Sequence, residues 1–149
     1  MRVVCIGAGP ASLYTAILLK KRWPDASIRL YEQNKPDDTF GWGVVFSDET
    51  LSHFEEADAE SIREITSHFA YWTDIETYVG DELVRSTGHG FCGLARRRLL
   101  EILSDRADEL GVALHYETEV TREELERTAD LVVASDGINS EVRENATET

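Results

Sequence analysis

A short apolar run that ends in a glycine-rich turn constrains the fold of this chain more than any other feature. The run is Arg2–Ile6, which we expect to be a buried β-strand, and Gly7-Ala8-Gly9-Pro10-Ala11-Ser12 follows it directly. From Ala11 to Arg22 the apolar side chains recur with a helical period, and three cations occupy the last turn, where they suit the helix dipole. A second apolar strand covers Ser27–Glu32. The opening segment therefore predicts a βαβ unit.

The rest of the chain continues to alternate helices with strands. Up to the middle of the chain we expect a loop over Gln33–Ser47, helices over Asp48–Ala57 and Ser61–Tyr71, a hairpin of Ile75–Val79 and Glu82–Ser86, and a glycine-rich loop over Gly88–Gly93. Beyond it we expect a helix over Arg96–Leu110 ended by Gly111, a strand over Val112–Tyr116, a helix over Thr121–Arg127 capped by Thr121 with Glu124, and a strand over Leu131–Ala134. This order predicts an α/β fold of the Rossmann-like type, with a mainly parallel sheet and an insertion made of helices and a β-hairpin.

The balance of charge excludes several classes of partner. The 149 residues include 15 basic and 29 acidic side chains, which gives a formal net charge of −14. Nucleic acids and anionic membrane surfaces should be repelled, and no apolar run approaches the length of a membrane span. The two cysteines, Cys5 and Cys92, form no disulfide framework, and the histidines show no metal-ligand spacing. We expect one cytoplasmic domain without a metal site.

The glycine-rich turn has the context of a dinucleotide-binding fingerprint, because it follows a strand and opens a helix. Gly7 would allow the tight turn, and Gly9 would let a pyrophosphate approach the backbone. The helix that begins at Ala11 offers unpaired N–H groups and a partial positive charge to phosphates. Ser12 stands where the third glycine of the fingerprint normally allows close packing of helix and strand. A glycine turn in some other α/β protein is the structural alternative.

Glu32 supplies the acidic partner of this fingerprint. It ends the second predicted strand and lies about 20 residues beyond the turn, where a carboxylate accepts hydrogen bonds from an adenosine ribose. A carboxylate at this place repels a 2′-phosphate and so disfavours NADP at this site. The residues alone do not distinguish FAD from NAD as the ligand of this site.

Two later motifs carry a family resemblance. The predicted helix that begins at Arg96 continues with Leu99 and Leu103, and Asp136-Gly137 follows the last buried strand. With the N-terminal fingerprint, in this order, they resemble the single-component FAD-dependent aromatic hydroxylases. The resemblance spans the chain and is closest to the salicylyl-CoA and anthraniloyl-CoA monooxygenase branch, through Pro36–Ser47 and Gly88–Gly93.

The resemblance implies a role for each motif. Gly7, Gly9, Pro10, Ala11 and Ser12 would hold the FAD pyrophosphate, Glu32 the adenosine ribose, and the Val120 backbone the adenine. Arg96 would approach the phosphates or the ribose, Asp136 and Gly137 would serve FAD and the reducing nicotinamide, and Arg143 would brace their loop. Without the resemblance, Arg96 could be a solvated helix start and Asp136-Gly137 an ordinary turn.

Three further side chains have less definite roles. His89 is expected to be a loop or flavin-pocket residue, and Cys92 to pack in the interior. Trp42 could border the flavin ring or pack in the core. The resemblance implies no catalytic side chain, because in this family the flavin carries the difficult chemistry.

The implied reaction is hydroxylation of an aromatic, specifically an aryl-CoA, substrate by NAD(P)H and oxygen through a C4a-hydroperoxyflavin. The later Gly-Asp motif and the substrate domain of that family do not occur in residues 1–149, so we expect an FAD-binding domain that does not hydroxylate by itself. It would act with the remainder of the enzyme or a partner subunit. The alternatives are a non-catalytic module that binds FAD or NAD, and an NAD-binding dehydrogenase domain.

Overall fold

The computed structural model describes residues 1–36, 38, 39, 41–46, 48–140 and 142. The chain divides into two compact units, one formed by residues 1–40 and 99–149 and the other by residues 41–98. Among the described residues, no helix combines the length and the apolar content that a membrane crossing requires.

The first unit is built on a four-stranded sheet in the order β8-β2-β1-β9, and every neighbouring pair in it is parallel. Its strands are β1 (Arg2–Ile6), β2 (Ser27–Tyr31), β8 (Ala113–His115) and β9 (Leu131–Ala134). β1 lies inside the sheet, where Cys5 pairs with Leu30 of β2 on one side and Val133 of β9 on the other. This arrangement confirms the predicted parallel sheet.

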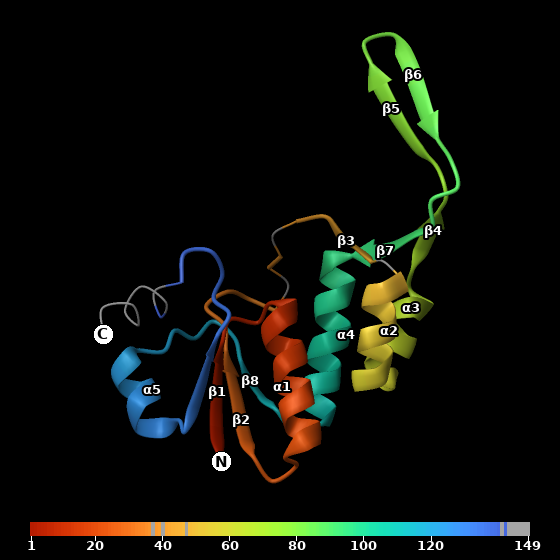
Figure 1. Ribbon diagram of the computed structural model, residues 1–149. Helices are drawn as coiled ribbons and strands as arrows, with labels where there is room; N and C mark the ends of the chain where they lie inside the picture. The colour runs from red at the N-terminus through yellow and green to blue at the C-terminus, as the bar shows by residue number, and fades with distance from the viewer. Residues whose placement is uncertain (37, 40, 47, 141, 143–149) are drawn as a thin grey trace. The chain divides into compact units, whose positions relative to one another are not determined.

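Helices of the first unit cover the sheet. α1 (Pro10–Arg22) packs on β1 and β2, and α5 (Arg122–Thr128) connects β8 to β9 on the opposite side (Figure 1). Opposite sides are expected, because right-handed crossovers that run in opposite directions along a sheet place their helices on opposite faces. The core is formed by fully buried apolar side chains of β1, α1 and β2, namely Val3, Val4, Cys5, Leu13, Ala16, Ile17, Ile28 and Leu30. The predicted capping box of Thr121 and Glu124 at the start of α5 is present.

The second unit combines an antiparallel sheet in the order β3-β7-β4 with two helices and a hairpin. Its elements are β3 (Gly43–Phe46), α2 (Asp48–Ala57), α3 (Ala59–Ser67), β4 (Ala70–Trp72), β5 (Ile75–Val79), β6 (Glu82–Ser86) and β7 (Phe91–Ala95), and it includes the first residues of α4 (Arg96–Glu109). Within this unit, Figure 1 shows the β5–β6 hairpin extending beyond β4 and β7. The predicted hairpin and the helix over Asp48–Ala57 are confirmed.

Two loop predictions were wrong. The expected loop over Gln33–Ser47 contains β3, and the expected loop over Gly88–Gly93 runs into β7. The reason is close strand pairing, because a Cβ at Gly93 would lie 2.6 Å from the carbonyl oxygen of Val44. Gly93 therefore allows close pairing of two strands and does not form a turn.

The helix expected over Ser61–Tyr71 also differs from the structure. It begins earlier, at Ala59, where the buried carboxylate of Asp58 accepts a 2.6 Å hydrogen bond from the Ser61 hydroxyl. It ends at Ser67, and β4 begins three residues later. Phe69 packs its ring between those of Phe46, at 5.4 Å, and Tyr71, at 5.9 Å. These aromatic contacts favour an extended segment over the continued helix that the local pattern predicted.

Candidate functional site

The carboxyl ends of the four parallel strands bring most of the predicted site residues to one edge of the sheet. Gly7 follows β1, Glu32 follows β2, Val120 lies in the segment after β8, and Asp136 follows β9. The strand pairing continues into this edge, because the N–H of Gly7 donates to the carbonyl of Tyr31 at 2.8 Å. In open α/β sheets, ligands bind at this edge.

The two glycines of the fingerprint meet different demands. Gly7 has a φ of +88°, and a Cβ there would lie 2.6 Å from the carbonyl oxygen of Ser135 and 3.2 Å from Cα of Asp136. Gly7 is thus required by the close approach of the segment that follows β9. Gly9 has an ordinary φ of −70°, and a Cβ there would meet no heavy atom within 4 Å. Gly9 therefore faces open space at the start of α1.

The first turn of α1 leaves donors available at that open space. Gly9 is the N-cap and makes no side-chain capping bond, and Pro10 has no N–H group. The N–H groups of Ala11 and Ser12 are those that helix geometry leaves without an intrahelical acceptor. The first turn, residues 10–13, carries no acidic side chain. Its partial positive charge is therefore not neutralised from within the turn, which suits a phosphate.

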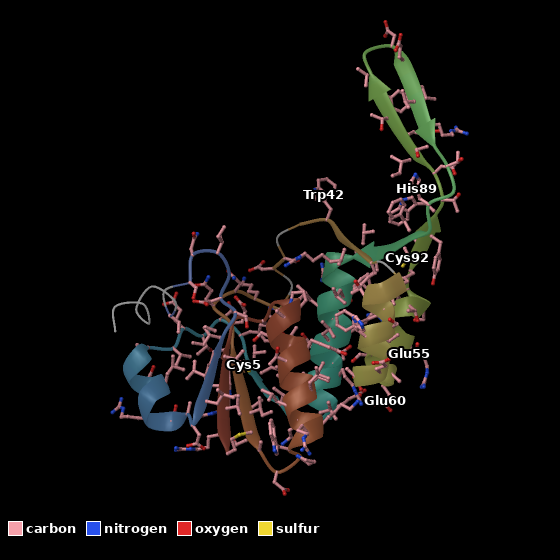
Figure 2. The ribbon with its side chains drawn as sticks, viewed as in Figure 1. Cys5, Trp42, Glu55, Glu60, His89 and Cys92 are labelled. Atoms are coloured by element: carbon pink, nitrogen blue, oxygen red, sulfur yellow. The ribbon has the colours of Figure 1, made fainter. Side chains whose placement is uncertain are left out.

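Ser12 stands at the position of the third glycine, and the structure buries it completely in the first unit. Its side chain is fully buried beside Cys5 of β1, so the departure from the fingerprint leaves α1 packed on the sheet. Burial raises the pKa of the Cys5 thiol to about 11, and the neighbouring Ser12 hydroxyl opposes part of that rise. Figure 2 shows Cys5 within the sheet.

Glu32 holds a defined position at the end of β2. Its Oε2 accepts the N–H of Ala8 from the glycine turn at 2.7 Å. Its Oε1 accepts two donors from Asn34, the backbone N–H at 2.8 Å and the side-chain Nδ2 at 2.7 Å. The half-buried carboxylate thus joins the glycine turn to the segment that follows β2.

The segment after β8 lies alongside the segment after β2. The N–H of Thr118 donates to the carbonyl of Glu32 at 2.9 Å, and the N–H of Glu117 donates to the carbonyl of Asn34 at 3.1 Å. Glu117 has a φ of +51°, a conformation that few non-glycine residues adopt. The half-buried Val120 follows two residues after Thr118. The predicted adenine contact therefore belongs to the same edge as the predicted ribose contact.

Asp136 contributes an unused buried acceptor to this edge. Its Oδ1 is buried and has no hydrogen-bond partner among the described residues. Buried acceptors are nearly always paired, so a donor from a ligand or from solvent would complete this site. A Cβ at the neighbouring Gly137 would meet no atom within 4 Å, as at Gly9. Arg143, which was expected to brace this loop, lies outside the described residues.

Arg96 belongs to the second unit. Its N–H donates to the carbonyl of Trp42 at 3.2 Å, which joins the start of α4 to the segment before β3. Its Nε is buried and has no hydrogen-bond partner within the described part of the chain. Arg98 differs, because it forms an ion pair with Glu64 at 3.3 Å. Arg96 is therefore not a fully solvated cation and keeps a donor that an anion could use.

Three residues with less definite predicted roles also lie in the second unit (Figure 2). Trp42 is 99% exposed, so the option that it packs in the core was wrong. His89 contacts Ser86 through Nε2 at 2.7 Å and stacks on Phe91 at a ring distance of 5.3 Å. Cys92 is buried in β7, as expected for a packing residue.

The sequence interpretation missed two residues of the site, Ala8 and Asn34. Ala8 acts through its backbone, which the fingerprint does not specify. Asn34 follows the strand-end acid by two positions, and asparagine commonly bonds to neighbouring groups in such turns. The position of Asn34, two residues after Glu32, was the sequence signal that could have identified it. In the described part of the chain, no cluster of three histidine, cysteine, aspartate or glutamate residues could hold a metal ion.

The site fits an elongated anionic ligand that carries a ribose. Open space at Gly9 and Gly137, a helix start without acidic neighbours, an anchored carboxylate and an unused buried acceptor occur along one edge. Phosphates suit the open space and the helix start, and hydroxyl donors suit the anchored carboxylate and the unused acceptor.

Comparisons with known proteins agree with this arrangement. Residues 1–149 match the family model described as FAD binding domain. Salicyloyl-CoA 5-hydroxylase of Streptomyces is 44% identical over 96% of this chain, which corresponds to 28% of that protein. Protodeoxyviolaceinate monooxygenase of Chromobacterium violaceum is 31% identical over 93% of this chain and 38% of that protein.

A solved structure also matches most of this chain. The tetrameric form of 2-methyl-3-hydroxypyridine-5-carboxylic acid oxygenase superimposes with a TM-score of 0.80 and 26% identity, over 97% of this chain and 42% of that chain. The resemblance drawn from the motifs is confirmed by these matches. The chain spans less than half the length of each of these relatives.

Proposed function

Because this chain belongs to the FAD-binding domain family, we propose that it is the FAD-binding part of a flavin-dependent monooxygenase that hydroxylates an aromatic substrate. The observation that carries the proposal is the carboxyl edge of the parallel sheet. There the open space at Gly9 and the anchored Glu32 carboxylate lie at the ends of neighbouring strands. Pyrophosphate and adenosine ribose require this combination.

Each residue of the edge would have a distinct role. The N–H groups at the start of α1 would bind the pyrophosphate, and Glu32 would accept a ribose hydroxyl. The backbone at Val120 would contact the adenine, and Asp136 with Gly137 would face the more distant part of the cofactor. Arg96 would provide a cation for the phosphates. These local features must outweigh a formal net charge of −14, which opposes an anionic cofactor at long range.

FAD, when bound, supplies the redox and oxygen chemistry of the hydroxylation, with NAD(P)H as the reductant. The chain itself binds and orients the cofactor, and no side chain in the edge needs to act as a nucleophile or a base. The 44% identity to salicyloyl-CoA 5-hydroxylase favours an aryl-CoA substrate.

The β5–β6 hairpin supports a further part of the proposal, that the hydroxylase needs another polypeptide segment. All ten residues of its two strands are exposed, including Tyr78 at 68% and Val79 at 66%. Isolated two-stranded hairpins are marginally stable in water, and contiguous exposed apolar side chains mark interaction surfaces. We propose that the hairpin packs against the substrate-covering part, supplied by the rest of the enzyme or by a partner subunit.

An absorbance spectrum and a flavin titration test the proposal. Purified protein mixed with FAD should show the flavin bands after gel filtration and should quench flavin fluorescence on titration. Arg96→Ala should weaken binding, and Arg22→Ala should not, although both variants remove one cation. Arg22 is exposed and lies over the Trp23 ring, so it is a matched control outside the site.

Other outcomes distinguish the alternatives. A colourless protein whose melting temperature rises with NAD and not with FAD would support an NAD-binding module. Equal losses from Arg96→Ala and Arg22→Ala would show that only overall charge matters. Turnover of an aryl-CoA with NADH by a flavin-free preparation of this chain would contradict both the cofactor and the need for another segment.

A further inference from the structure

Asn34 occupies a junction that neither the fingerprint nor the family resemblance assigns. Its side chain bonds to Glu32, and its backbone bonds to both Glu32 and Glu117. We propose that Asn34 is a positioning residue for ribose recognition: it orients the Glu32 carboxylate and ties it to the segment that carries Val120. The inference rests on the proposed binding of FAD at this edge.

The Asn34 contacts define one orientation of the carboxylate. The backbone N–H and Nδ2 of Asn34 both donate to Oε1 of Glu32, at 2.8 Å and 2.7 Å. The opposite oxygen, Oε2, accepts the Ala8 N–H at 2.7 Å. Three donors from two segments therefore hold one half-buried carboxylate, which limits its rotation. Hydrogen bonds to a charged acceptor are among the stronger ones in proteins.

The same contacts decide which oxygen remains available to a ligand. A carboxylate offers about four acceptor sites, two on each oxygen. Oε1 has two donors from Asn34, whereas Oε2 has one donor from Ala8. The remaining acceptor is on Oε2, beside the glycine turn. Asn34 thus directs an incoming hydroxyl to the oxygen nearest the predicted pyrophosphate site.

The backbone of Asn34 connects this carboxylate to the predicted adenine contact. Its carbonyl accepts the N–H of Glu117 at 3.1 Å, and the next residue, Thr118, donates to the carbonyl of Glu32 at 2.9 Å. The φ of +51° at Glu117 shows that this segment is held in an uncommon conformation. Asn34 therefore bonds to both parts of the edge that would contact adenosine.

A pair of isosteric variants tests the role of the side chain. Asn34→Asp replaces the Nδ2 donor by a carboxylate oxygen next to Oε1 of Glu32. Gln33→Glu adds the same charge one residue earlier, on an exposed side chain outside the site. FAD affinity is measured for both variants by fluorescence quenching at pH 8 and at pH 5.5, with melting temperatures recorded without FAD.

We expect the two variants to differ in their pH profiles. At pH 8, Asn34→Asp places two ionised carboxylates in contact, and FAD affinity should fall roughly ten- to a hundredfold relative to Gln33→Glu. At pH 5.5 the pair can share a proton, which restores a donor to Glu32, and the ratio should fall to about threefold or less. The other titratable groups around this edge are unchanged in both variants: Tyr31, Lys35, Asp38, His115, Glu117 and Asp136.

The outcomes separate the inference from the proposed function. If the unaltered protein does not bind FAD, the proposed function fails. If it binds FAD and the Asn34→Asp ratio is the same at both pH values, the positioning role is overturned. Should Asn34→Asp not fold at pH 8, Asn34→Ala decides: an unchanged FAD affinity in a folded protein overturns the role, and a loss that is independent of pH supports it.

Discussion

Replacing each of the two fingerprint glycines by alanine should separate fold from binding. Gly7→Ala would place a Cβ 2.6 Å from the carbonyl oxygen of Ser135 and 3.0 Å from its carbonyl carbon, at a φ of +88°. Neither contact can be relieved by a side-chain rotation, because both atoms belong to the backbone. Gly9→Ala would place a Cβ in open space at a φ of −70°, which alanine adopts readily.

The two substitutions should differ in their effect on the free energy of unfolding. A left-handed conformation costs a non-glycine residue about 1–2 kcal/mol, and overpacking of a tight contact costs about 1–3 kcal/mol. Gly7→Ala should therefore lower the free energy of unfolding by about 2–5 kcal/mol. Gly9→Ala should change it by no more than about 1 kcal/mol, because alanine restricts the unfolded chain but is a poorer N-cap residue for α1 than glycine. FAD binding should be weakened by Gly9→Ala, whose methyl group occupies the proposed approach of the pyrophosphate.

Urea unfolding followed by tryptophan fluorescence measures the first quantity, and flavin titration of the folded protein measures the second. A change in midpoint at constant slope identifies a loss of stability. The reasoning is refuted if Gly7→Ala unfolds within about 0.5 kcal/mol of the unaltered protein, the range of ordinary surface changes. A Gly9→Ala variant that binds FAD as tightly as the unaltered protein would refute the second half.

Three further predictions concern the first unit. Hydrogen bonds from the side chain and the backbone N–H of Arg2 lower the pKa of the Asp130 carboxyl to about 2, from 3.8, so their stabilising effect is present above about pH 4 and is lost as the pH falls toward 2. Melting temperatures of Asp130→Asn should therefore fall less steeply than those of the unaltered protein in this window. Thr121→Ala removes the cap of α5 and should cost about 1 kcal/mol in urea unfolding. The buried Cys5 thiol, with a pKa of about 11, should resist iodoacetamide at pH 8 in the folded protein and react in urea, as followed by mass spectrometry.

The parallel sheet and its edge could be predicted because each signal was local. A β-branched run before Gly7, a helical period after it and an acid at the end of the next strand are all readable within 32 residues. The capping box at Thr121 was equally local. Parallel pairing then brings the strand ends together without further information, which is why Glu32 and Asp136 lie at one edge.

Contacts between residues far apart in the sequence could not be predicted from local patterns. Gly93 has the composition of a loop, and only its approach to Val44 explains its place in β7. The ring of Phe69 ends α3 because it packs on Phe46, which is far away in sequence. Asn34 gains its importance from Glu32 and Glu117 together, and Glu117 lies in the segment after β8, far from Asn34 in sequence.

The central place of β1 has a consequence for the synthesis of the protein. β1 is made first, yet one of its two neighbours is β9, and Arg2 meets Asp130 at a separation of 128 positions. Ribosomes add about 5–20 residues per second, so the hundred or so residues between β2 and β9 take about 5–20 s to produce. Throughout that interval one side of β1 has no strand to pair with, and unpaired strand edges promote association with other chains. Translation speed and chaperone access should therefore influence the yield of this domain more than the stability of its finished sheet would suggest.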